Sequence, residues 1–170
     1  MRIRSASRAD AEAIERIRVR GWQVAYRHVF PPNELDRMRV DWSRWTDSLT
    51  YPEPGFSCFV AEEDGTILGW ATVGPALDRD GVGELHGLYV DPACWGRGAG
   101  RALLERAETE LARTWRHAVL WTLEDNPRTR RFYEAAGWRV DGLTGIFHKL
   151  GVEAPTVHYA KRLRSSTSRW

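Results

Sequence analysis

The sequence predicts an α/β (α+β) fold, a mixed and mostly antiparallel central sheet of about six or seven strands flanked by about four helices. Two β-rich runs joined by Asp64-Gly65 predict an antiparallel hairpin, because this dipeptide suits a two-residue turn. The apolar run HAVLWTL at 117–123 has strand length and predicts a strand in the middle of the sheet, buried on both faces. Amphipathic segments with helix caps lie between the strand-like runs, so helices are expected on the faces of the sheet.

The composition is that of one soluble domain. A chain of 170 residues is long enough for one sizeable core, and we expect a single domain over 1–170. The net charge of +2 provides no clustered basic footprint, so nucleic acid is not an expected partner. The charged N-terminal stretch has no apolar signal region and no apolar run could span a bilayer, so no membrane partner is expected and the expected location is cytoplasmic. Two cysteines without metal-ligand spacing predict no metal site.

The first 55 residues predict one strand followed by helices. The run RIRSA at 2–6 is a short edge strand, and the next helix is capped by Ser7 with Asp10 in the capping-box position. The predicted buried face of this helix consists of Ile14, Ile17, Gly21 and Val24. The segment 30–38 opens a second short helix with two prolines, and 40–49 continues in helical or irregular form up to the breaker YPEPG.

From Phe56 the hydrophobic period changes to that of strands. The hairpin strands are 56–63 and 66–74, and GELHGLYV at 83–90 is the next strand, which ends at Asp91-Pro92. A glycine-rich turn then leads into a helix. The predicted buried stripe of that helix consists of Leu103, Leu104, Ala107 and Leu111.

A fully punctuated helix follows the central strand. Asn126 is its N-cap, Pro127 occupies its first position, and Gly137 comes just after its end. Two further strands at 138–150 and 156–163, joined by a loop GVEAP, are expected to complete the sheet.

The stretch WGRGAGR at 95–101 places three glycines between a strand and a helix, which is the pattern of an anion site. The first N–H groups of a helix have no intrahelical partner, and the helix dipole favours negative charge there. A nucleoside-triphosphate loop would need Gly-Lys-Ser/Thr, whereas Gly100 is followed by Arg101 and Ala102. A dinucleotide fingerprint would need a third glycine where the chain has Arg101 or Leu103. Both phosphate-binding patterns therefore fail, and the alternative to an anion site is a tight connection between the strand and the helix.

The remaining pattern resembles the pyrophosphate-binding turn of the GNAT superfamily of N-acetyltransferases, with Gly98 and Gly100 as the two glycines. A second stretch in the expected order, NPRTRRFYEAAGW at 126–138, is similar to the fourth helix of that family. The resemblance covers residues 2–163 and implies the GNAT fold. It also implies an acetyl-CoA-dependent N-acetyltransferase, with acetyl-CoA as a substrate and no metal.

The same resemblance divides the chain into three parts. Residues 1–55 would form the acceptor side, 56–150 the cofactor-binding core, and 151–170 the last strand and tail. Trp95 departs from the family pattern, which has Arg or Gln there, so a side-chain contact is expected to be lost or replaced by apolar packing.

The resemblance places the pyrophosphate of coenzyme A on the main-chain N–H groups of 97–102, with Arg97 and Arg101 as charge partners. The strand before the turn would offer unpaired main-chain groups to the pantetheine and the oxyanion, if it diverges from its neighbour. Arg128, Arg130 and Arg131 are candidates for the 3′-phosphate. The cofactor-binding candidates are Leu88, Tyr89, Val90, Trp95, Gly96, Arg97, Gly98, Ala99, Gly100, Arg101, Ala102, Asn126 and Tyr133.

Acetyl transfer to an amine needs a base, a donor to the oxyanion and an acid for the thiolate. Glu84 is the leading candidate base, since strict strand alternation puts it on one face with His86, Leu88 and Val90. His86 is the rival, because imidazole ordinarily titrates near neutral pH. Tyr133 matches the family tyrosine and would protonate the thiolate. The structural alternatives are a solvated carboxylate, a core histidine and a packed core aromatic.

The acceptor-site candidates are Trp22, Tyr26 and His86, since aromatic rings can hold an ammonium group; the alternative is that they belong to the core. The leading function is acetyl transfer to a primary amine of a small molecule by direct attack. The alternatives are acetylation of a protein or peptide N-terminus or lysine, and an acyl-CoA-binding module with little catalysis. Trp22, Tyr26 and Trp42 favour a closed site over an open groove. A possible homodimer through the C-terminal strands rests on family analogy alone.

Overall fold

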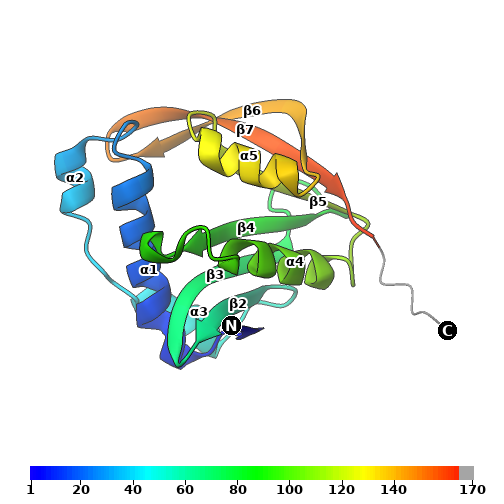
Figure 1. Cartoon of the computed structure of the whole chain (residues 1–170). Helices are drawn as coiled ribbons and strands as arrows, with labels where there is room; N and C mark the ends of the chain where they lie inside the picture. The colour runs from blue at the N-terminus through cyan, green and yellow to red at the C-terminus, as the bar shows by residue number, and fades with distance from the viewer. Residues whose placement is uncertain (165–170) are drawn as a thin grey trace.

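A computed structural model describes residues 1–164, which form one seven-stranded sheet with helices on both faces (Figure 1). The strand order is β1-β2-β3-β4-β5-β7-β6, and β4–β5 is the parallel pair in an otherwise antiparallel sheet. The predicted mixed, mostly antiparallel α/β fold is therefore confirmed. The last part of the predicted tail, 165–170, lies outside the described residues.

The elements follow the predicted order with one additional helix. The strands are β1 (Arg2–Ser5), β2 (Ser57–Glu63), β3 (Thr66–Pro75), β4 (Gly83–Val90), β5 (His117–Leu123), β6 (Arg139–Lys149) and β7 (Val152–Arg162). The α-helices are α1 (Ala11–Ala25), α2 (Pro32–Asp36), α3 (Ser43–Thr50), α4 (Ala99–Leu111) and α5 (Pro127–Ala135), with short 3-10 turns η1 (Arg8–Asp10) and η2 (Pro92–Cys94). Five α-helices are present instead of about four, because the segment that the sequence left helical or irregular forms α3.

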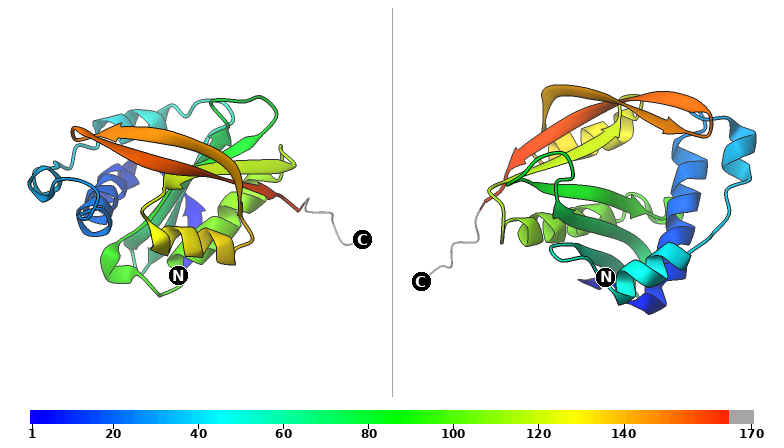
Figure 2. Two further views of the ribbon diagram at one scale, coloured as in Figure 1. Left: turned by 90° about the horizontal axis from the view of Figure 1, so that it is seen from above. Right: turned by 180° about the vertical axis from the view of Figure 1, so that it is seen from behind.

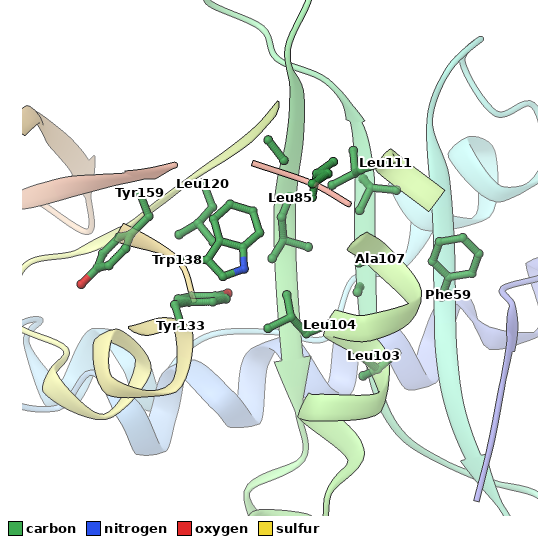
Figure 3. Close-up of a cluster of buried hydrophobic side chains, with 14 of the residues drawn as sticks. Phe59, Leu85, Leu103, Leu104, Ala107, Leu111, Leu120, Tyr133, Trp138 and Tyr159 are labelled. Carbon is green, nitrogen blue, oxygen red and sulfur yellow. The ribbon is translucent and has the colours of Figure 1, made fainter. Parts of the chain in front are cut away.

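The helices cover the two faces of the sheet in unequal layers. Figure 1 shows α4 and α5 on one face, and the right-hand view of Figure 2 shows α1 and α3 on the other. The main core lies under α4 and α5 (Figure 3). It contains the whole predicted stripe of α4, Leu103, Leu104, Ala107 and Leu111.

The buried face of α1 differs slightly from the predicted one. Ile14 and Ile17 pack against Trp70 of β3, as expected for a helix that covers the sheet. Val24, in contrast, is exposed. The buried residues of α1 occupy a sector of the helix circumference that begins at Ile17 and includes Trp22. Val24 lies just outside this sector, so its side chain is exposed.

Local turn and cap signals are reproduced at atomic detail. The main-chain N–H of Ser7 donates to Oδ2 of Asp10 at 2.8 Å, which forms the predicted capping box. Asp64 and Gly65 both have positive φ, 49° and 75°, as a two-residue hairpin turn requires. The side chain of Asn126 accepts a hydrogen bond from the N–H of Thr129 at 3.2 Å and so caps α5.

Two predictions about the later strands were wrong. Strand β7 begins at Val152, so most of the predicted loop GVEAP is strand, and the turn is made by Leu150 and Gly151 with φ of 51° and 75°. Strand β5 lies in mid-sheet as predicted, but it is not buried on both faces, since Trp121 is 36% exposed. The reason is that β5 loses its neighbour on one side before it ends.

Strands β4 and β5 separate soon after they begin. They pair only at Gly83 with Ala118 and at Glu84 with Val119, so from Leu85 onward this edge of β4 has no partner strand. The other edge of β4 pairs with β3 through to Val90. The predicted divergence of β4 is therefore present, and it opens the sheet at its centre.

None of the helices in the described part of the chain combines the length and apolar character that a membrane crossing requires.

Candidate active site

The glycine turn opens directly into the space between β4 and β5. Gly96 and Gly98 have φ of 79° and 89°, a left-handed conformation that side chains rarely adopt, and Gly98 is the N-cap of α4. The first intrahelical bond runs from the N–H of Ala102 to the carbonyl of Gly98 at 3.1 Å. The predicted contribution of the Ala102 N–H was therefore wrong, because the helix uses it. The N–H groups of 99–101 in the first helical turn have no intrahelical acceptor.

The two arginines of the turn have different positions. Arg101 lines the cavity beside the helix start. Arg97 instead points to Glu63 of β2, with its guanidinium 2.6 Å from the carboxylate, and does not line the cavity. A charge partner inside the cavity is therefore Arg101 and not Arg97.

Trp95 makes two contacts at the position where the family has Arg or Gln. Its indole N–H donates to the carbonyl of Val90 at 2.8 Å, which ties the turn to the end of β4. The guanidinium of Arg128 lies over the Trp95 ring, 3.7 Å from its centre, and Arg128 also lines the cavity. The expected contact is therefore replaced by a hydrogen bond and a cation–π pair, and a cation is retained near the turn. The Val90 carbonyl is not free for a ligand.

The alternation predicted for β4 does not hold along the strand. Thr72 of β3 pairs with Gly87 and Val73 pairs with Leu85, so His86 forms a bulge. An extra residue in a strand reverses the faces of everything after it. Leu88, like Leu85, packs in the main core under α4. Glu84 is therefore not on the same face as Leu88 and Val90.

Glu84 and His86 nevertheless form a contact pair at the bulge. Nε2 of His86 donates to the carbonyl of Pro75 at 3.1 Å, because a carbonyl can only accept. The other nitrogen, Nδ1, then faces the Glu84 carboxylate at 3.5 Å. His86 lines the cavity, whereas Glu84 does not and accepts a long bond from the N–H of Leu77 at 3.4 Å. His86 is thus the member of the pair that reaches the ligand space.

Tyr133 of α5 belongs to both the core and the cavity. Its ring packs beside Trp138 and Leu120 (Figure 3), and it also lines the cavity. Burial raises the pKa of its phenol above the ordinary value, with a smaller contribution from Tyr89. The hydroxyl therefore stays protonated at neutral pH. Burial likewise raises the pKa of Tyr26, and a side-chain hydrogen bond with Asn126 opposes that rise.

The acceptor-side candidates Trp22 and Tyr26 line the same cavity, from α1 and the residue after it. Trp22 is almost fully buried, its indole N–H donates to the Tyr89 hydroxyl at 3.1 Å, and its ring packs against Tyr26 with ring centres 4.9 Å apart. Phe147 of β6 approaches the Trp22 ring with centres 5.9 Å apart. Trp42 is exposed and does not line the cavity. Trp22 therefore belongs both to the hydrophobic core and to the wall of the cavity.

The cavity between these elements has a volume of about 810 Å³. The predicted cofactor and acceptor residues line it except Arg97, Ala102 and two of the 3′-phosphate candidates, Arg130 and Arg131. Sequence reasoning missed Trp121, Phe147 and Thr156, because they lie in strands that it assigned to the sheet interior or the sheet edge. A bulky aromatic at the end of a strand next to the divergence is the signal that would have found Trp121. Within residues 1–164 no group of three or more His, Cys, Asp or Glu side chains could hold a metal ion.

Comparison with known proteins agrees with this geometry. The family described as the acetyltransferase (GNAT) family matches residues 14–138. The chain is 28% identical over 164 residues to the "Probable N-acetyltransferase" of Mycobacterium tuberculosis, with 94% of this chain and 92% of the relative covered. It is 31% identical over 147 residues to the L-methionine sulfoximine/L-methionine sulfone acetyltransferase of Salmonella typhimurium, with 82% and 81% covered.

A solved structure shares the same fold. The PaiA N-acetyltransferase of Thermoplasma acidophilum in complex with coenzyme A superposes with a TM-score of 0.74 at 18% identity, covering 95% of this chain and 98% of that chain. At this identity the likeness concerns the fold alone. The match over residues 14–138, together with the relatives, shows that the chain belongs to the GNAT family of acetyltransferases.

Proposed function

We propose that this protein transfers the acetyl group of acetyl-CoA to the primary amine of a small molecule by direct attack. Membership of the family makes the chain an acetyl-CoA-dependent N-acetyltransferase. The observation that carries the finer proposal is the cavity itself. One continuous space joins the glycine turn, the free edge of β4 and a group of aromatic side chains, so that a thioester and an amine can meet inside it.

The glycine turn fits the pyrophosphate of coenzyme A. A methyl group built on Gly98 would meet no atom within 4 Å, so the space in front of this backbone is open to a ligand. The N–H groups at the start of α4 and the positive end of its dipole favour an anion there. Arg101 and Arg128 supply the compensating positive charge. The free edge of β4 offers main-chain groups to the amides of the pantetheine arm.

The residues around the centre of the cavity supply the proton transfers. The amine nitrogen attacks the thioester carbonyl carbon, and the C–S bond breaks from the tetrahedral intermediate. Nδ1 of His86 accepts the amine proton by way of a water molecule, since Glu84 lies against this nitrogen, and the carboxylate stabilises the positive charge that results. An N–H of the free β4 edge donates to the oxyanion. The Tyr133 hydroxyl gives its proton to the leaving thiolate, and solvent returns a proton to the phenolate.

The contacts between aromatic rings at the cavity favour a small acceptor over a polypeptide. Contact between the Trp22 and Phe147 rings joins α1 to β6 across the end of the cavity. His28 extends this closure, since its Nε2 donates to the carbonyl of Asp125 at 2.8 Å. A peptide would need an open groove at this position. The Salmonella typhimurium relative, by its name, acts on L-methionine sulfoximine and L-methionine sulfone, which are small acceptors.

Two measurements test the proposal. Calorimetry with coenzyme A checks the cofactor site, and a thiol-release assay with acetyl-CoA compares small amines with peptides that carry a free N-terminus or lysine. We expect micromolar to millimolar cofactor affinity and turnover of small amines only. Turnover of peptides alone would favour the protein acetyltransferase alternative. Cofactor binding without turnover of any amine would favour the acyl-CoA-binding module.

A homodimer through the C-terminal strands also remains a proposal. Strand β6 is an outer strand of the sheet, and all but one of its residues are exposed. Its exposed apolar side chains are Val140, Leu143, Ile146 and Phe147. An unpaired, partly apolar edge is suited to antiparallel pairing with the same edge of a second copy about a two-fold axis.

A further inference from the structure

We infer that the acceptor is a primary amine attached to an apolar aryl or alkyl body, with no carboxylate beside the amine. This inference rests on the proposed acetyltransferase function and names the class of acceptor. Two observations support it. Aromatic rings and the His86–Glu84 pair lie at the same cavity, and the arginines that line the cavity lie at its phosphate end.

The acceptor end of the cavity is lined by aromatic rings from three separate parts of the chain. Trp22 and Tyr26 come from α1 and the residue after it, Trp121 from β5, and Phe147 from β6. Trp121 and Phe147 are 36% and 37% exposed, so each presents ring surface that a ligand can cover. The apolar surface of these rings favours the burial of apolar groups, and the negative face of each ring attracts an ammonium group.

The charges along the cavity are divided between its two ends. Among residues 1–164, the cationic side chains that line it are Arg101 in the first turn of α4 and Arg128 in the first turn of α5. Both lie beside the glycine turn, and Arg128 is stacked on Trp95. The proposed phosphates use this positive charge, so it is not available to an acceptor carboxylate.

The pair formed by Glu84 and His86 disfavours an acceptor that carries a carboxylate. Glu84 lies against His86, so the pair includes a carboxylate that repels a second carboxylate brought close to it. Arg79, on the loop after β3, is a cation near Glu84. Its guanidinium lies 3.2 Å from the carboxylate of Asp78, and this ion pair partly neutralises its charge. An α-amino acid places its carboxylate two bonds from the reacting nitrogen, and that carboxylate would be desolvated without a partner. An amine without the carboxylate avoids this loss.

The direct test compares three acceptors that share one benzyl side chain. They are 2-phenylethylamine, L-phenylalanine and L-phenylalaninamide, and the measured quantity is kcat/KM at saturating acetyl-CoA. We expect 2-phenylethylamine to exceed L-phenylalanine by about a hundredfold, because a site rejects strongly a group that it leaves unpaired. The amide should recover most of the difference, since it has a similar shape without the charge. Equal or better turnover of L-phenylalanine overturns the inference, and so does an amide as poor as the acid.

A variant at the rim ties the preference to the aromatic enclosure. Phe147→Ala should raise KM for 2-phenylethylamine by about tenfold with coenzyme A affinity unchanged, because it removes one apolar wall of the acceptor end alone. Trp42→Ala is the matched control, an exposed aromatic outside the cavity, and should change neither value. An unchanged KM in Phe147→Ala contradicts the inference.

Two different results distinguish a wrong acceptor class from a wrong proposed function. A protein that does not bind coenzyme A in calorimetry removes the proposed function. A protein that binds coenzyme A yet prefers L-phenylalanine, or turns over none of the three amines, removes only the acceptor class inferred here.

Discussion

Tyr133 shows how one residue serves both packing and chemistry. Its ring lies among Trp138 and Leu120 in the core, and its edge lines the cavity. Because burial raises its pKa, the phenol keeps its proton at neutral pH and can donate it where negative charge develops on the departing sulfur. The packing thus holds the donor rigid and protonated.

Removal of this hydroxyl tests the assigned proton transfer. Tyr133→Phe should lower kcat by about 10²–10⁴ and leave coenzyme A affinity nearly unchanged, because the ring still packs while the proton donor is lost. Steady-state thiol release and calorimetry measure the two quantities. Tyr159→Phe is a control, since it removes a hydroxyl bonded to Glu134 at 2.7 Å outside the cavity. An unchanged kcat in Tyr133→Phe removes Tyr133 from the mechanism.

Arg128 is a second residue whose substitution tests the site, here through coenzyme A binding. Its guanidinium is held over Trp95 beside the glycine turn, where it can meet a phosphate. Arg128→Gln should weaken coenzyme A binding by about tenfold, and the difference from the wild type should shrink as salt is added. Calorimetry at two ionic strengths checks this. Arg37→Gln, which removes an exposed cation paired with Glu34, should leave the affinity unchanged.

At the scale of elements, the junction of β4 and α4 depends on two glycines with different tasks. Gly98 has positive φ, so any side chain there is strained. Gly100 has ordinary φ, and a methyl group would lie 3.6 Å from Phe132 and Val90 at the cavity wall. Both glycines keep side-chain atoms away from the turn, and Gly98 in addition has a backbone conformation that a side chain would strain.

Alanine at each position separates these tasks. Gly98→Ala should lower the free energy of unfolding by about 1–2 kcal/mol and also weaken coenzyme A binding. Gly100→Ala should keep or slightly raise stability, because alanine is the better helix former, yet still weaken binding. Denaturant unfolding and calorimetry on both variants measure this. Equal stability loss in the two would contradict the assignment.

The junction of β1 and α1 is stabilised by a charge pair that is sensitive to acid. Arg4 donates to both carboxylate oxygens of Asp10 at 2.8 Å, and these bonds hold the pKa of Asp10 below its ordinary value of 3.8. The folded state therefore binds the proton less tightly than the unfolded state. The resulting stabilisation is complete above pH 3.8 and is lost as the pH falls through the lowered value.

Comparison of the wild type with Asp10→Asn isolates this contribution. At pH 7 the variant should be less stable by about 2 kcal/mol, because a hydrogen-bonded charge is lost. The difference should decrease below pH 3.8, since the wild-type carboxylate then becomes neutral as well. Urea unfolding from pH 7 to pH 3 measures it. A difference that stays constant across this range would argue against the ion pair as the cause.

At the scale of the whole molecule, the divergence of β4 and β5 creates the site. α4 and α5 bring the glycine turn and Tyr133 from one face of the sheet, and α1 brings Trp22 and Tyr26 from the other (Figures 1 and 2). The two halves meet only where the sheet is open. The outer strand β6 then closes the aromatic end through Phe147.

The same strand makes the proposed dimer testable. Ile146→Glu places a charge on the exposed face of β6 and should shift the protein toward the monomer, since desolvating a charge at the edge opposes pairing. Sedimentation velocity across a concentration range measures the state. A wild type that sediments as a monomer at all concentrations would rule out the dimer. Tyr51→Glu, on an exposed side chain away from β6, is the control.

The sequence by itself determined the features that depend on neighbours along the chain. The hairpin at Asp64-Gly65, the helix caps at Ser7 and Asn126 and the glycine turn were predictable because φ preference and first-turn hydrogen bonding act over a few residues. The buried stripe of α4 followed from helical spacing for the same reason. The family resemblance added Tyr133 to the cavity, but it could not say that the helix itself would occupy the Ala102 N–H.

Only the tertiary structure decided what depends on strand pairing. The bulge at His86 reverses the faces of β4. Gly87 in the sequence permits a bulge here, but the pairing with β3, which skips His86, decides that it forms. Trp121 and Phe147 face the cavity because pairing between β4 and β5 stops after Glu84. Side chains far apart in sequence thus become neighbours through the pairing of strands, a cooperative property of the whole sheet that local preferences do not encode.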